Sequence, residues 1–179
     1  MEDLSLHILD IVENSIEAGA DRIEVIVTED IQRDTLIIEI KDNGRGIDNK
    51  TLKKVFDPFF TTRKTRRVGL GLSLIAQAAK ESGGDIAIKS KKAKGTTLTV
   101  TFQYSHIDRK PLGNMVETLI VLIAANPEID FLYKHVRDNN SYIFDTRKIK
   151  RELRGIPINT PDTLISIRME IEEGLKSLG

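Results

Sequence analysis

The chain has no cysteine and no long apolar run, and each absence removes a class of protein. Without cysteine it has no disulfide framework, thiolate metal site or thiol nucleophile, which is compatible with a reducing compartment. No stretch approaches the ~20 apolar residues that are needed to cross a bilayer, and the N-terminus does not resemble a signal peptide. We therefore expect a cytoplasmic protein that has no membrane partner.

The chain also has no excess of charge, because it contains 27 Lys and Arg and 27 Asp and Glu residues. No overall field draws it to nucleic acid, so nucleic acid is not an expected partner. The basic residues near 63–67 and 89–94 are interpreted as solvated charge. At 179 residues and 40% hydrophobic composition, the chain can bury a core, and we expect two units.

The first hundred residues predict a repeated order of helix and hairpin. Apolar residues recur at helical spacing after Leu4, and Gly19 ends that pattern. Beta-branched alternating runs separated by turn residues predict hairpins. The expected elements are a helix over 4–18, strands over 22–28 and 35–41, a loop over 51–68, a helix over 70–82, and strands over 85–90 and 96–102.

After Phe102 the pattern changes, which suggests a second unit. We predict a helix over 111–125, a hairpin over 131–145 that turns at 138–140, and a final helix that Thr160 and Pro161 begin. The apolar stripe of the final helix is interpreted as core, with a dimer or partner seam as the alternative. The predicted domains are residues 1–104 and an accessory or partner-interaction region over 105–179.

Polar residues on the first helix share one face. His7, Asp10 and Asn14 are spaced by three and four, so they form a stripe that can face a ligand. Asn14 supplies a neutral oxygen that suits a Mg²⁺ ion bridging phosphates. Asp10 is a candidate base that orients or deprotonates water. His7 is expected to make a local hydrogen bond.

Glycines mark two further parts of the predicted site. Gly44 and Gly46 let the backbone approach a flat ring, and Asp42 at a strand end can accept a hydrogen bond from an exocyclic amine, so adenine fits. Gly69 and Gly71 open a helix, whose free amides can bind phosphate. The basic residues that precede them include Arg63 and Lys64.

In their order along the chain these motifs resemble the GHKL ATPase superfamily over residues 4–102. Glu13-Asn14 resembles the N box, Asp42 to Gly46 the first glycine box, Gly69 to Leu72 the second, and Gly95-Thr96-Thr97 a late Gly-Thr element. The resemblance implies an α/β (α+β) two-layer sandwich of a mixed sheet and helices, the Bergerat ATP-binding fold, with a small C-terminal α/β appendage. It implies ATP and Mg²⁺ as cofactors, Asn14 as the metal ligand, and these further cofactor-binding residues: Asp42, Gly44, Gly46, Ile47, Phe60, Arg63, Lys64, Gly69, Leu70, Gly71, Leu72, Thr96 and Thr97.

Different segments of the chain resemble two different subfamilies. Residues 56–63 and the following Gly-Leu-Gly-Leu-Ser resemble the F box and lid of histidine kinases. Residues 13–20 resemble the mismatch-repair ATPases, although those proteins carry a Glu where Asp10 stands. Glu17 occupies the place at which histidine kinases usually have a lysine.

His106 is a weaker candidate phosphoacceptor. The run from Ser105 to Leu112 has the His, Arg, Pro and Leu spacing of a kinase phosphoacceptor box, but Ile107 replaces the acidic neighbour. We interpret the similarity as coincidence. Loss of label from γ-labelled ATP in His106→Ala would be required to assign this role.

The sequence is compatible with three functions. The leading interpretation is a stand-alone histidine kinase-like domain that transfers phosphate, or signals by nucleotide state, to a protein partner. The alternatives are an autonomous ATPase whose lid closure over 59–68 drives association, including self-dimerisation, and an ATP-gated binding module of anti-sigma type. With few residues before the N box, we do not expect a complete conventional sensor kinase.

Overall fold

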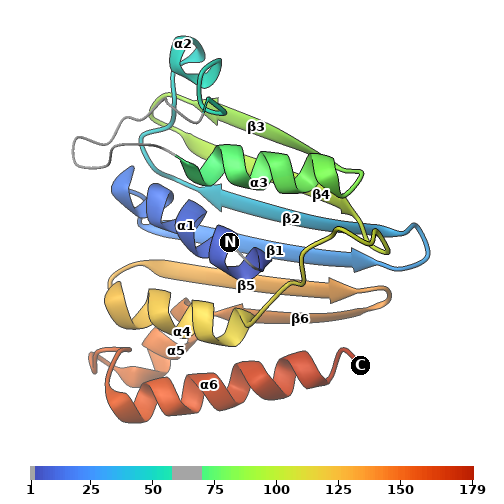
Figure 1. Ribbon diagram of the computed structural model, residues 1–179. Helices are drawn as coiled ribbons and strands as arrows, with labels where there is room; N and C mark the ends of the chain where they lie inside the picture. Colours follow the sequence, from blue (N-terminus) through green and yellow to red (C-terminus); the bar gives the residue numbers. More distant parts are fainter. Residues whose placement is uncertain (1–2, 58–69) are drawn as a thin grey trace.

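The computed structural model describes residues 3–57 and 70–179 (Figure 1). Helices α1, α3, α4 and α6 lie on one face of a sheet, so the described elements form two layers (Figure 1). This arrangement confirms the predicted fold class. The elements are α1 Leu4–Glu17, β1 Arg22–Asp30, β2 Thr35–Asp42, α2 Asn49–Leu52, α3 Leu70–Glu81, β3 Asp85–Lys91, β4 Gly95–Gln103, α4 Met115–Ala125, β5 Asp130–Arg137, β6 Asn140–Asp145, α5 Thr146–Leu153 and α6 Pro161–Lys176.

The six strands form one mixed sheet in the order β3-β4-β2-β1-β5-β6. Neighbours are antiparallel except β1 and β5, which are parallel, with Ile23 opposite Phe131. The chain reaches β5 from β4 through α4, because parallel strands need a long crossover. The hairpins β1–β2, β3–β4 and β5–β6 agree with the sequence prediction, whereas the parallel pairing was not foreseen.

The core lies between the sheet and the helical layer. Every second residue of each central strand faces the helices and is buried, as in Val25 and Val27 of β1 and Ile38 and Ile40 of β2. These side chains contact apolar residues from all four helices of that layer. The residues are Ile8 and Val12 of α1, Ile75 and Ala79 of α3, Leu119 and Ile123 of α4, and Ile167 and Ile171 of α6. One hydrophobic cluster therefore includes residues from both halves of the chain.

Helix α4 begins later than the sequence predicted. Residues 111 and 112 are not helical, and their carbonyl oxygens accept hydrogen bonds from the backbone N–H groups of Leu4 and Ser5 at 2.9 and 2.7 Å. Gly113 has a φ of 84°, which is outside the helical region, and the Asn114 side chain then caps α4 by accepting from the Glu117 N–H. Residues 111 and 112, which we expected to begin this helix, instead accept hydrogen bonds from N–H groups at the start of α1 that have no partner within α1.

The C-terminal region continues the sheet instead of standing apart from it. The boundary predicted between residues 104 and 105 falls in the connection from β4 to α4, and β5 then pairs with β1 along its whole length. Helix α5, which the sequence analysis missed, is capped by the Asp145 side chain and held by Lys150, whose ammonium group donates to Asp130 at 2.9 Å. Within the described residues, no helix is both long enough and apolar enough to traverse a lipid bilayer.

Candidate functional site

Asp10 and Asn14 lie one helical turn apart on α1 and face the first turn of α3. A Cβ atom at Gly71 would overlap the Asp10 carboxylate and would lie 3.9 Å from the Asn14 amide nitrogen. Glycine at position 71 therefore lets the N-terminal turn of α3 approach both polar side chains. The fold thus brings the N box together with Gly71 of the second glycine box.

His7 does not share this polar surface. Its side chain is buried, with 4% of the residue exposed, and its Nδ1 atom has no hydrogen-bond partner in the described part of the chain. Burial lowers the pKa of His7 because the charged form loses its hydration. The local hydrogen bond that we expected is absent at Nδ1, and the stripe facing α3 consists of Asp10 and Asn14.

Asp42 is the last residue of β2, and its carboxylate is held from two sides. The Ser15 hydroxyl donates to Oδ2 at 2.6 Å, and the Gly44 N–H donates to Oδ1 at 2.9 Å. Ser15 is buried on α1 and follows Asn14 directly, so one helix positions both ends of the predicted site. This role is not visible in the sequence, because Ser15 has the spacing of the apolar stripe.

The glycines of the first box lie where the chain packs against other backbone. A Cβ at Gly44 would lie 2.9 Å from the Ala18 carbonyl oxygen, and the Arg45 N–H donates to that same oxygen at 2.9 Å. Gly46 has a φ of 70°, and a Cβ there would overlap the backbone of Lys91. Any other residue at 46 would be strained and would collide with the β3–β4 hairpin.

Ser90 joins the first glycine box to the late Gly-Thr element. Its hydroxyl accepts from the Ile47 N–H at 2.7 Å and lies 2.7 Å from the Thr96 hydroxyl. Thr96 pairs with Asp42 in the sheet register, so it lies on the same face as Asp42. Thr97 points to the opposite face because successive strand residues alternate. Of the two predicted threonines, only Thr96 lies beside the other candidates.

The other candidate site residues are Leu72, His106 and a set that lies outside the described residues. Leu72 is half-buried against the core on the first turn of α3. Phe60, Arg63, Lys64 and Gly69, together with the predicted lid, lie outside the described residues, and only the backbone of Leu70 is described. His106 lies beside Gly83, near the end of α3 that is remote from Gly71. About seven strand residues, or roughly 23 Å, separate the β4 residue paired with Asp42 from Gln103, which precedes His106. Within a single chain, His106 therefore lies far from the other candidate site residues.

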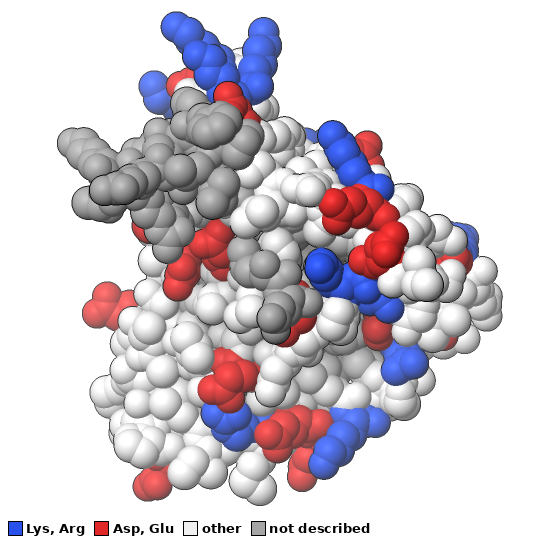
Figure 2. Space-filling model, viewed as in Figure 1, with Lys and Arg blue, Asp and Glu red and all other residues white. Residues whose placement is uncertain are grey.

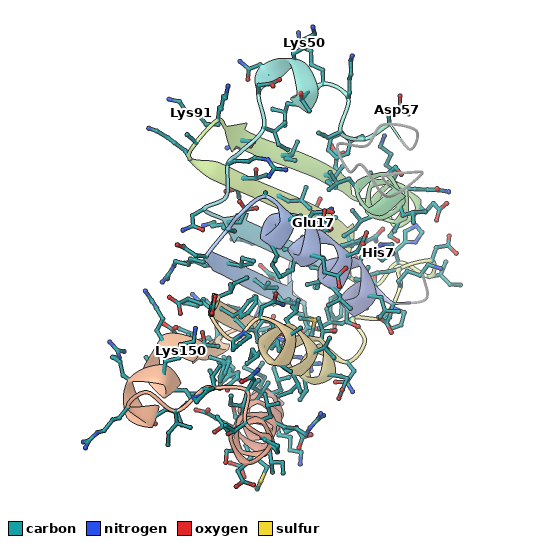
Figure 3. All side chains as sticks on the ribbon, turned by 90° about the vertical axis from the view of Figure 1, so that its left-hand side faces the viewer. His7, Glu17, Lys50, Asp57, Lys91 and Lys150 are labelled. Carbon is teal, nitrogen blue, oxygen red and sulfur yellow. The ribbon has the colours of Figure 1, made fainter. Side chains whose placement is uncertain are left out.

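Figure 3 looks along the sheet at the end where these motifs meet. Glu17 of α1, Lys50 of α2 and Lys91 of β3 surround this end (Figure 3). Among residues 3–57 and 70–179, no cluster of three or more His, Asp or Glu side chains could hold a metal ion. The Asn14 amide oxygen is a hard donor of the kind Mg²⁺ binds when phosphates supply its other ligands.

Solved structures share this fold. The N-terminal domain of a DNA repair protein superposes with a TM-score of 0.57 at 18% identity, over 80% of this chain and 52% of that one. The ATPase domain of MutL from Aquifex aeolicus, solved with ADP, superposes with a TM-score of 0.52 at 19% identity, over 79% of this chain and 63% of that one. At these identities the likeness shows the fold alone.

Sequence comparison identifies sensor kinases as relatives. The sensor histidine kinase WalK of Bacillus subtilis is 35% identical over 111 residues, which are 58% of this chain and 18% of WalK. The histidine-protein kinase AtoS of Escherichia coli is 40% identical over 97 residues, or 52% of this chain and 15% of AtoS. This chain thus spans less than a fifth of either kinase. The family model of histidine kinase-, DNA gyrase B- and HSP90-like ATPases matches residues 2–106, more than half of the chain. The chain therefore belongs to this ATPase family.

Proposed function

We propose that the chain binds MgATP at the end of the sheet where Asp42 meets α1, and that it transfers phosphate, or signals by nucleotide state, to a protein partner. The observation that carries this proposal is the Asp42 carboxylate, which Ser15 and Gly44 hold in place at the end of β2. Such a carboxylate accepts a hydrogen bond from the exocyclic amine of adenine. The two glycines of the first box let the backbone next to it pack closely against Ala18 and Lys91.

The other end of the site suits the phosphates. The first turn of α3 presents the positive end of a helix dipole, which favours an anionic group such as a phosphate. Asn14 would hold the magnesium ion through its amide oxygen, and the bound ion would neutralise phosphate charge. Family membership and the similarity to sensor kinases support ATP as the ligand. The MutL domain, solved with ADP, supports a nucleotide at this fold.

Binding and turnover should be tested together. Calorimetry with MgATP and MgADP measures binding, and incubation of γ-labelled ATP with the protein and a lysate of its source shows where the phosphate goes. Label on a second protein supports the kinase function. Label on this chain that disappears in His106→Ala would assign His106 as the acceptor. No heat of binding at millimolar nucleotide would contradict the whole proposal.

ATP hydrolysis is a second candidate function, and the position of Asp10 favours it. The carboxylate lies against the first turn of α3, next to Asn14, where it can orient or deprotonate a water molecule near the phosphates. In the kinase function, by contrast, the chain needs no such base for water. The two functions therefore make different demands on this side chain.

Asp10→Asn should reduce steady phosphate release by at least about a hundredfold if the chain hydrolyses ATP, because a general base commonly contributes that much or more. MgATP binding should persist, because the amide has nearly the same shape. Phosphate release and calorimetry on the same sample separate the two effects. Asp85→Asn, the same change at an exposed position at the far end of β3, is the control. Undiminished release in Asp10→Asn would rule out the base role.

Ser15→Ala should weaken MgATP binding by about fivefold, because one hydrogen bond that holds the Asp42 carboxylate is lost, at a cost of about 1 kcal/mol. Ser5→Ala is a matched control, since Ser5 is also buried on α1 but bonds to Asp3 at the other end of the helix. Both variants should lose some stability, and only Ser15→Ala should lose affinity. Equal affinities in calorimetry would show that Ser15 does not position the nucleotide-binding carboxylate.

A further inference from the structure

Six exposed lysines surround one corner of the molecule. Lys50, Lys53 and Lys54 belong to α2 and the turn after it, and α2 contacts β3. Lys91, Lys92 and Lys94 belong to the end of β3 and the β3–β4 turn. We call these six residues the α2 basic patch. Figure 2 shows Lys and Arg side chains gathered over this corner, which is the position of α2 in Figure 1.

The chain itself neutralises the patch only in part, through the Asp48 carboxylate that caps α2 and interacts electrostatically with Lys92. In the part of the chain that the structure describes, none of the six ammonium groups forms an ion pair, whereas Lys41 and Lys150 elsewhere do. Six like charges held at one corner repel one another, so an anionic surface that covers them is favoured over leaving them bare. The fold keeps them together because α2 lies against β3.

The charge balance indicates what kind of anion fits. Positive and negative side chains are equal in number over the whole chain, so the patch leaves the rest of the molecule with an excess of negative charge. A nucleic acid that extends past the patch would meet this excess. The six members are all lysines, so they offer no aromatic ring or guanidinium on which bases stack. A short acidic segment of a protein, which supplies carboxylates and no bases, matches the patch in chemistry.

The patch is joined directly to the first glycine box. The Ala93 N–H in the β3–β4 turn donates to the Arg45 carbonyl oxygen at 2.6 Å. Gly46 packs so closely on the Lys91 backbone that a Cβ has no room between them. Anything that fixes this turn also fixes the glycine backbone on which the proposed adenine site depends.

We propose that the α2 basic patch is the docking surface for an acidic segment of a partner protein. We further propose that docking and nucleotide binding strengthen each other through the contact of Gly46 with Lys91. This second part rests on the proposed function, and the first part does not. Both ligands would favour the same arrangement of this turn, so each would raise the affinity for the other.

The docking test uses a fluorescein-labelled peptide of alternating glutamate and glycine, with binding followed by anisotropy without nucleotide. The triple variant Lys50→Glu, Lys53→Glu, Lys94→Glu should bind the peptide at least about tenfold more weakly, because like charges then oppose it. The matched control reverses three exposed cations on and just after α5, Lys148, Arg151 and Arg154. They lie near the other edge of the sheet, so this control should retain the affinity.

Three results would overturn docking by an acidic protein segment. The first is unchanged peptide affinity in the patch variant, and the second is an equal loss in the α5 control, which would mean a general charge effect. The third is tighter binding, lost in the patch variant, of an oligothymidylate of equal charge or of phosphatidylglycerol vesicles, which would assign the patch to nucleic acid or membrane. Circular dichroism confirms that each variant is folded.

The linkage test repeats the peptide titration with saturating MgATP. Peptide affinity should rise at least about fivefold, and MgATP affinity should rise by the same factor when peptide is present, because linkage is reciprocal. If calorimetry shows MgATP binding but the peptide affinity does not change, the linkage is wrong and the proposed function stands. If MgATP does not bind, the proposed function and the linkage fail together, and the nucleotide-free titration decides the docking surface.

Discussion

MgATP affinity should fall at least about tenfold when Asp42 is replaced by asparagine, while the stability of the fold changes little. The Asp42 carboxylate accepts a hydrogen bond from Ser15 through one oxygen and a hydrogen bond from Gly44 through the other. Asparagine keeps one oxygen, and the serine hydroxyl can rotate to accept from its amide group. The local structure therefore survives, but the group that meets the adenine amine loses acceptor capacity. A lost hydrogen bond to a charged group costs about 1.5–3 kcal/mol.

Calorimetry with MgATP measures this loss, and urea unfolding measures the stability of the same variant. Asp85→Asn is the control, because Asp85 is exposed at the far end of β3 and is also a strand residue. It should leave the affinity unchanged. An Asp42→Asn protein that binds MgATP as tightly as the parent would remove the residue on which the proposed adenine site rests.

The second large effect concerns Ile171 on α6. Ile171→Ala should lower the free energy of unfolding of the whole chain by roughly 2–5 kcal/mol, since the side chain is fully buried in the cluster that joins the helices to the sheet. Because β5 pairs with β1 and the core is shared, unfolding should remain one transition. Urea titration followed by circular dichroism checks both points.

Ile165 provides a matched control on the same helix. It is 58% exposed, so Ile165→Ala should cost less than about 0.5 kcal/mol. The division into residues 1–104 and 105–179 makes a different prediction. If those ranges unfold separately, Ile171→Ala would shift only one of two transitions and leave the other at the parent's midpoint.

Local signals in the sequence predicted most elements because each depends on neighbouring residues. Thr160 caps α6 and Pro161 occupies its first turn, as the pair of residues indicated. The turn at 138–140 joins β5 to β6 as predicted. Helix α5 was missed because Asp145 serves both as the end of a strand and as the cap of a helix that begins at the next residue.

Features that depend on distant partners were not visible in the sequence. The late start of α4 follows from its upstream residues bonding to α1, and the parallel pairing of β1 with β5 spans most of the chain. Asp42, Asn14 and Gly71 could be proposed from motif chemistry, and the fold places them at one end of the molecule. Ser90 gave no signal, because a serine in a strand shows its role only when the Ile47 backbone lies beside it.

The parallel pairing of β1 with β5 also shapes how the chain is made. A ribosome that has delivered β1 must add about 100 more residues before β5 emerges and occupies the free side of β1. Until then β1 presents unpaired backbone donors and acceptors that can template another nascent copy. Aggregation during translation should therefore depend on how long β1 remains without β5. Chaperones that shield nascent chains should reduce aggregation most in that interval.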